Sequence, residues 1–278
     1  MSDSPANTDS SLAPREGWHV IHLYYHIDRT QWESLTRDEQ REAKTGLAEL
    51  VQEIRSHKDT QLLTFAVTTP KADIGFMLLT PDLRKATLFE KQLTLSLGAD
   101  VLTPAYSYLS QTERSEYTTT REQYAAETLI AEKGLSEGSE DYEKALTEFD
   151  QRMEHYLQHR LYPVLPDWPV VCFYPMSKRR LGNDNWYSLD YEERRKLMMG
   201  HAKTGRTYSG RILQLITGST GFEDYEWGVT LLAHDPIDIK HIVYEMRFDE
   251  VSARFGEFGD FYIGLQLPLD ELFKQICL

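Results

Sequence analysis

Cysteine and cationic side chains are scarce in this sequence. Its 278 residues include only Cys172 and Cys277, too few for a disulfide framework or a thiolate zinc site, which fits a reducing compartment. The 30 Lys and Arg are outnumbered by 44 Asp and Glu, giving a net charge of -14. Because phosphate contacts need clustered cations, this charge argues against a nucleic-acid-binding protein. We therefore expect no nucleic-acid partner.

Long apolar runs are missing as well. No stretch approaches the length that crosses a bilayer, and residues 1–16 lack the apolar centre of a signal peptide. These sixteen residues are rich in Ser, Asp, Ala and Pro, a composition that predicts a disordered tail. The sequence therefore predicts a cytoplasmic protein with no membrane span.

Two similar series of strand and helix patterns fill the rest of the chain. In residues 17–116, aromatic and β-branched runs alternate with segments whose apolar residues recur every three or four positions, in the order β-α-β-β-α-β. Residues 166–278 repeat this order, and residues 117–165 between them predict a polar helical connector. We expect an α+β fold of two ferredoxin-like halves. Their sheets would either pack on one another or curl into an antiparallel β-barrel flanked by helices, the dimeric α/β-barrel type.

One histidine stands on a partly apolar helix face in the second half. Leu197 and Met198 precede His201 by four and three residues, and Gly205 and Tyr208 follow at offsets of four and three, so these residues share one side of the helix. A neutral imidazole that projects from such a face can serve as an axial haem ligand. The alternative is a core or interface histidine whose ring nitrogens are satisfied by hydrogen bonds.

Cations gather locally in this acidic chain. Residues 177–211 contain nine Lys or Arg against four Asp or Glu. The run of three cations at 194–196 predicts a solvated helix exterior. Lys178, Arg206 and Arg160 lie beside aromatic or small residues, which suits the binding of a carboxylate.

Two more side chains are candidates for a pocket. Tyr174 ends a strand before Pro175 and is either a packing residue with a bonded hydroxyl or, beside a haem edge, a phenol that can be oxidised. Gln214 shares a strand face with Ile212 and Ile216, and is either a structural amide or a distal hydrogen-bond donor.

Several long motifs resemble one family. The runs HAKTGRTYSGRILQLITGSTGFEDYEWGVTLLAHD and KHIVYEMRFDEVSARFGEFGDFYIG, with FYPMSKRRLGNDNWY and HRLYPVLPDW, closely resemble the coproheme decarboxylases, the HemQ branch of the chlorite dismutase-like superfamily. The resemblance is strong from about residue 160 to residue 264 and fainter in the first half. It implies two ferredoxin-like halves per subunit, of which the second, residues 166–278, binds haem, and a homopentamer.

The resemblance also implies a reaction. Two propionates of iron coproporphyrin III (coproheme) are oxidatively decarboxylated to vinyls with hydrogen peroxide as oxidant, giving haem b and CO2 in the last step of coproporphyrin-dependent haem biosynthesis. The porphyrin is then both substrate and redox cofactor, and a ferrochelatase that delivers it would be a transient partner.

Site residues follow by position in the matched motifs. His201 resembles the iron ligand, Tyr174 the tyrosine whose radical starts each decarboxylation, and Gln214 the distal residue. Arg206 and Arg247 have a supporting role. The positions that resemble porphyrin and propionate contacts are Arg160, Tyr174, Pro175, Met176, Ser177, Lys178 and Ser252.

The resemblance departs from two sister groups at the distal position. Chlorite dismutation relies on a distal arginine, where this chain has Gln214, and the distal histidine of actinobacterial decarboxylases is also absent. We expect a weak neutral His201 as iron ligand. The alternatives are a haem-binding carrier or sensor, a chlorite dismutase-like or peroxidase-like haem protein, and a structural protein without a ligand.

Overall fold

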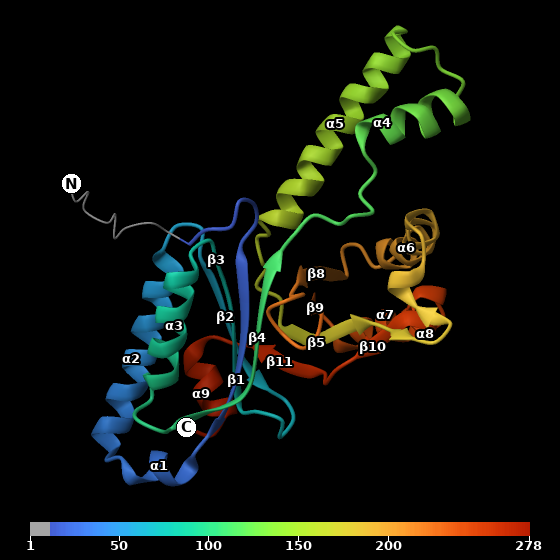
Figure 1. Ribbon diagram of the computed structural model, residues 1–278. Coiled ribbons are helices and arrows are strands. Elements are labelled where there is room, and N and C mark those ends of the chain that lie inside the picture. Colours follow the sequence, from blue (N-terminus) through green and yellow to red (C-terminus); the bar gives the residue numbers. More distant parts are fainter. Residues whose placement is uncertain (1–11) are drawn as a thin grey trace, which may run out of the picture.

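The computed structural model describes residues 12–278, so most of the tail expected at residues 1–16 lies outside the described part. Figure 1 shows two halves built around a continuous sheet, with a helical arm projecting from one end. The N-terminal half runs from blue to green, the arm from green to yellow-green, and the C-terminal half from yellow to red.

The first half has the predicted order of elements with one short extra helix. It consists of β1 (His19–Ile27), α1 (Arg29–Ser34), α2 (Arg37–Ser56), β2 (Gln61–Val67), β3 (Ile74–Thr80), α3 (Leu83–Leu95) and β4 (Leu102–Thr112). A capping box between Thr36 and Glu39 begins α2, whose residues Leu47, Val51 and Ile54 are buried. The helices thus pack an apolar face on the sheet.

The expected connector is a helical hairpin. It contains α4 (Arg121–Gln123), the π-helix η1 (Tyr124–Glu132) and α5 (Glu140–Leu161), and Figure 1 shows these helices projecting from the body. Its own small core is formed by Leu129, Tyr142 and Leu146. None of the helices within residues 12–278 is long and apolar enough to cross a membrane.

The second half repeats the order with small additions. Its main elements are β5 (Val170–Lys178), α6 (Tyr191–Arg206), β8 (Ile212–Gly218), β9 (Trp227–Ala233), α7 (Pro236–Met246) and β11 (Tyr262–Gln266). The additions are β6 (Arg180–Leu181), β7 (Asp184–Asn185), the 3-10 helix η2 (Trp186–Ser188), α8 (Glu250–Phe255), β10 (Gly256–Phe258) and the final helix α9 (Leu269–Gln275).

The sheet closes on itself. Among the described residues, nine strands pair in the order β10-β5-β11-β2-β3-β1-β4-β8-β9, and β5 also pairs with β9. Since β5 has β11 on one side and β9 on the other, eight antiparallel strands form a ring. Of the two arrangements expected from the sequence, the structure has the curled one. The interior is aromatic and includes Tyr24, Phe65, Tyr108 and Phe173.

The outer face of the second half positions the candidate site. Alternate residues of β5 point out of the ring, and Val170, Cys172 and Tyr174 pack there in one cluster with Ile239 and Ile242 of α7. Helices α6 and α7 therefore cover this face of the sheet.

Candidate functional site

A pocket lies between α6 and the outer face of β5, β8 and β9, and α7, α8 and β10 complete its walls. Its cavity volume is about 40 Å³, within about 470 Å³ of space between the atoms that is partly open to solvent. The pocket brings together seven of the residues considered from the sequence: Tyr174, Met176, Lys178, His201, Gln214, Arg247 and Ser252. The rest of the lining is apolar and consists of Ile216, Val229, Val243, Met246 and Phe258.

His201 and Gln214 come from opposite walls. His201 is on α6 and Gln214 is on β8, so a flat ligand between helix and sheet would have the imidazole on one side and the amide on the other. The structure thus places these two candidates on the helix side and the sheet side of one pocket.

Pro175 and Ser177 are not among the residues that line the pocket. Successive side chains of a strand point to opposite faces, so these two point away from the face that presents Tyr174 and Met176. The Ser177 hydroxyl accepts a hydrogen bond from the Glu226 backbone N–H at 3.2 Å. The expectation that the whole run 174–178 contacts one ligand thus ignored the alternation of the strand.

Arg160 and Arg206 also lie outside the pocket lining. Arg160 is in the last turn of α5, where its Nε donates to the Glu113 carbonyl at 2.8 Å. Arg206 is exposed at the end of α6. Cations at these positions complement the negative end of a helix dipole.

The prediction that residues 194–196 form a solvated helix exterior is wrong for Arg194 and Arg195. The Arg194 Nε donates to the Tyr117 hydroxyl at 3.2 Å, and Arg195 pairs with Glu127 at 2.6 Å. Only Lys196 is exposed. The connector covers this part of α6. The local sequence of α6 does not predict this contact, because its partners lie far away in the chain.

His201 is oriented by a carboxylate. Its Nδ1–H donates to Asp249 Oδ2 at 2.6 Å, and the imidazole is only 20% exposed. A neutral ring that donates through Nδ1 keeps a lone pair on Nε2, which is the atom available to a metal. Because a carboxylate partner raises the basicity of a metal-ligating imidazole, this contact favours a stronger iron ligand than the weak histidine expected from the sequence.

Asp249 is the functional residue that sequence reasoning missed. It is the N-cap of α8 and accepts hydrogen bonds from the Ser252 N–H at 3.3 Å and the Ser252 hydroxyl at 3.2 Å. One carboxylate therefore connects the candidate iron ligand to a candidate propionate contact. The spacing of Asp249 and Ser252 is that of a helix cap, but nothing local in the sequence brings His201 to it.

Lys178 is a buried cation in this pocket. Its residue is 8% exposed, and burial lowers the pKa of the ammonium from 10.5 to about 8, against the opposing effect of Asp249 and Glu226. Its Nζ lies 4.7 Å from the centre of the Trp186 ring. A buried ammonium of this kind is stabilised by an anionic ligand.

Arg247 is the second cation in the pocket. Its guanidinium carbon lies 4.4 Å from the centre of the Phe258 ring. The pocket thus has two cations beside apolar walls, an arrangement suited to an amphipathic molecule with carboxylates.

Tyr174 is held by aromatic rings. It is 5% exposed and stacks on Phe261 with ring centres 4.3 Å apart. Burial, with a smaller contribution from Cys172, raises the pKa of its phenol well above the usual value, although Arg247 opposes the shift. The phenol is therefore neutral at ordinary pH, and its oxidation has to release a proton together with an electron.

The residues present fit an iron porphyrin. None of the sixteen residues of α6, all within the described part of the chain, is fully buried, although the helix faces an apolar pocket. A flat apolar ligand would supply the packing that α6 lacks. In a porphyrin the macrocycle supplies most of the iron ligands, so a single imidazole such as that of His201 is sufficient from the protein.

Comparisons with known proteins agree on one family. The family model described as chlorite dismutase matches residues 40–267 of this chain. A solved structure described as a novel heme-binding protein from Thermus thermophilus is 37% identical, with a TM-score of 0.78 over 95% of this chain and 96% of that one.

More distant structures share the fold. A mutant chlorite dismutase from Candidatus Nitrospira defluvii is 17% identical, with a TM-score of 0.70 over 95% of this chain and 98% of the other. The same enzyme in complex with imidazole gives a TM-score of 0.69 at 17% identity, over 95% and 97%. Both support the closed sheet with flanking helices described above.

Proposed function

Because this chain belongs to the chlorite dismutase family, we propose that it binds iron coproporphyrin III in the pocket beside His201 and decarboxylates two of its propionates. Hydrogen peroxide is the oxidant, and the products are haem b and CO2. The heme-binding description of the Thermus thermophilus relative supports a porphyrin as the ligand. The neutral, buried phenol of Tyr174 inside the same pocket is the observation that carries the reaction.

His201 and Asp249 hold the iron in this proposal. The Nδ1–H of His201 stays on Asp249, so Nε2 faces the metal in a fixed orientation. When bound, the iron porphyrin supplies the redox chemistry that consumes hydrogen peroxide. The amide of Gln214, on the opposite wall, provides a hydrogen-bond donor without a charge.

Lys178, Arg247 and Ser252 bind carboxylates in this proposal. The buried ammonium of Lys178 needs an anionic partner in the pocket, and a carboxylate bound there raises its pKa again. Arg247 is exposed and adds a second cation for the carboxylates of the ligand. The N–H and the hydroxyl of Ser252 both donate to Asp249, so its hydroxyl binds a carboxylate of the ligand only by turning away from Asp249. A substrate with four carboxylates explains why cations are kept in one pocket of a chain with a net charge of -14.

Tyr174 transfers electrons between the oxidant and the propionate. The oxidised phenoxyl takes a hydrogen atom from the propionate carbon next to the macrocycle, which restores the phenol. Loss of CO2 and of one further electron then leaves the vinyl group. For each propionate, the carboxylate form, one hydrogen peroxide and one proton give a vinyl, one CO2 and two waters. Stacking on Phe261 keeps the ring of Tyr174 in place for this step.

Chlorite dismutation is the second candidate, because the family model and the distant structures carry that name. Gln214 at the distal position favours the decarboxylase. From the family resemblance we also propose a cytoplasmic homopentamer that receives its substrate from a ferrochelatase.

The test is anaerobic loading of the full chain with iron coproporphyrin III, followed by stepwise addition of hydrogen peroxide and mass spectrometry of the extracted porphyrin. We expect two successive losses of a carboxyl group, through a three-propionate intermediate. Tyr174→Phe should bind the porphyrin but stop both losses. Tyr208→Phe is the matched control, because Tyr208 is a buried tyrosine of the same apolar cluster that does not line the pocket.

Other outcomes would replace the proposal. Binding followed only by bleaching of the porphyrin indicates a carrier or a peroxidase. Oxygen release from chlorite would favour the second candidate. If the protein binds no iron porphyrin, the pocket beside His201 has been misassigned.

A further inference from the structure

The helix that carries His201 depends on polar contacts for its position. None of the residues of α6, which is described in full, is completely buried, whereas the neighbouring α7 buries Ile239, Ile242 and Met246. Packing in a core fixes a helix through many contacts at once. The apolar contacts of α6 include the partly buried Leu197 and Met198, which pack on the cluster around Phe255. Because no residue of α6 is completely buried, hydrogen bonds and ion pairs contribute a large part of what fixes its position.

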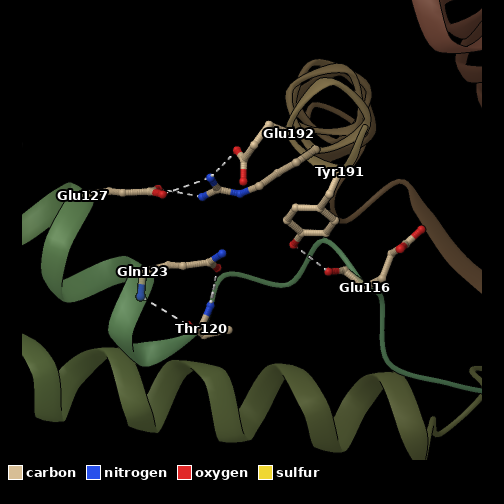
Figure 2. A network of polar contacts seen from close by, with 7 residues as sticks. Glu116, Thr120, Gln123, Glu127, Tyr191 and Glu192 are labelled. Atoms are coloured by element: carbon tan, nitrogen blue, oxygen red, sulfur yellow. Dashed lines mark hydrogen bonds and ion pairs between the residues drawn. The ribbon is translucent and has the colours of Figure 1, made fainter. Parts of the chain in front are cut away.

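The strongest of these contacts joins α6 to the connector. Arg195 Nη1 donates to Glu127 Oε1 at 3.0 Å, and Nη2 donates to Glu127 Oε2 at 2.6 Å, so the guanidinium holds both carboxylate oxygens. Figure 2 shows Glu127 extending from the connector helix toward α6, with Glu192 on the other side of the same contact. The Arg195 side chain is 11% exposed. A bidentate, charge-assisted pair fixes direction as well as distance.

Local hydrogen bonds hold the connector segment that carries Glu127. Figure 2 shows the capping box of Thr120 and Gln123, in which each residue bonds to the backbone N–H of the other at 3.0 and 3.2 Å. Next to it, Arg121 pairs with Asp150 of α5 at 3.1 Å, but these side chains are 53% and 48% exposed, so this pair contributes little to the shape of the arm. The buried cluster of Leu129, Tyr142 and Leu146 holds the helices of the arm together instead.

Further contacts join the same two segments. The Tyr191 hydroxyl donates to the Glu116 carbonyl at 3.0 Å, as Figure 2 shows. Arg194 bonds to the Tyr117 hydroxyl, and its Nη2 lies 3.6 Å from the Glu116 carboxylate. All of these are on the first half of α6, whereas His201 is on the second half and meets Asp249, the N-cap of α8. The first half is thus fixed by the connector and the second half forms the pocket wall.

We propose that the ion pair between Arg195 and Glu127 is a positioning contact that holds the His201 helix against the connector and limits how fast a porphyrin leaves the pocket. The inference rests on the proposed binding of a porphyrin between α6 and the sheet. A ligand in that place can leave only when α6 moves away from β8 or when the ligand slides out along the helix. Both routes become easier when the first half of α6 is released.

The size of the effect follows from the exposure of the pair. Exposed ion pairs change an equilibrium by about two- to fivefold at most. The Arg195 side chain is 11% exposed and that of Glu127 is 51% exposed, so the pair is only partly shielded from solvent. Because the pair is bidentate, we expect the dissociation rate of the porphyrin to rise by about three- to fivefold when it is removed, the upper end of the range for exposed pairs. Salt should speed dissociation from the wild-type protein and have less effect once the pair is gone.

The experiment uses the full chain loaded with ferric haem b, and follows transfer of haem to excess apomyoglobin by absorbance. Glu127→Gln removes the pair with little change in shape. Asp150→Asn is the matched control, because it removes one negative charge from the same arm, in the pair with Arg121, and touches no residue of α6 in the contacts above. Arg195→Lys keeps the positive charge but cannot make the bidentate contact. Its rate of haem dissociation should therefore lie between the rates of the wild-type protein and Arg195→Gln.

The proposal requires faster dissociation in Glu127→Gln, no change in Asp150→Asn, and no further increase when Glu127→Gln and Arg195→Gln are combined. Equal rates in all variants would overturn it, and so would an equal rise in Asp150→Asn, which would indicate a general effect of charge. Haem that fails to bind the wild-type protein would instead refute the proposed function.

Discussion

Replacing Asp249 by Asn tests whether this carboxylate supports the iron ligand. Asn is as good a helix N-cap as Asp, so α8 should still form. The amide oxygen can accept the Nδ1–H of His201, which now donates at 2.6 Å to a carboxylate, but without the charge. Hydrogen bonds to charged groups contribute roughly 1 to 1.5 kcal/mol more than neutral ones. We therefore expect about tenfold weaker binding of an iron porphyrin, at the lower end of the effects of such partners.

The assay compares two ligands in wild type and Asp249→Asn. Iron coproporphyrin III should lose about tenfold in affinity in a spectroscopic titration. Metal-free coproporphyrin III needs no axial ligand, so its affinity should stay the same or rise slightly, since a negative charge near its carboxylates is removed. An equal loss for both porphyrins would refute the reasoning, because Asp249 would then act on the shape of the pocket. Unchanged binding of both would show that His201 does not depend on this carboxylate.

Two further predictions concern stability. Burial lowers the pKa of Lys178 from 10.5 to about 8, so between these pH values the unfolded chain holds a proton that the folded ligand-free chain has lost. The free energy of unfolding should therefore rise with pH across this window, by an amount on the order of 3 kcal/mol, and urea denaturation of Lys178→Met should lack that rise; parallel curves would contradict it. Gly75→Ala should cost about 1–3 kcal/mol, because an added Cβ would overlap the Phe65 ring. Gly46→Ala on α2, where a Cβ meets nothing within 4 Å, is its control and should not destabilise the protein in the same denaturation experiment.

Local patterns in the sequence were sufficient for the order of the elements. Apolar spacing and the Thr36 cap predict α2, and aromatic runs predict β1 and β5, because these signals lie within a few residues of each other. The closure of the sheet depends on the pairing of β5 with both β9 and β11. That pairing joins distant segments through backbone hydrogen bonds, which any strand sequence can make, so the sequence left stacked sheets open as an alternative.

The site residues likewise divide into those that a local pattern predicts and those that depend on contacts between distant segments. The alternation of β5 separates Tyr174 and Lys178, which line the pocket, from Ser177, and a strict period of two would have predicted that. Asp249 and Arg195 depend on contacts between α6 and segments far away in the chain. Their charges are visible in the sequence, but their partners are not.

The two polar contacts of α6 have different consequences for a ligand. At the second half, the bond from His201 to Asp249 fixes the direction of the imidazole and, through Ser252, connects the metal side of the pocket to a carboxylate contact. At the first half, Arg195 and Glu127 fix where the helix lies relative to the connector. The described residues of α6 are at most partly buried, with Leu197 and Met198 on a small cluster, so packing alone gives this helix little of its orientation. The apolar face of a bound porphyrin would complete the packing of α6. A contact that holds this helix in its binding position therefore also raises the affinity for the porphyrin.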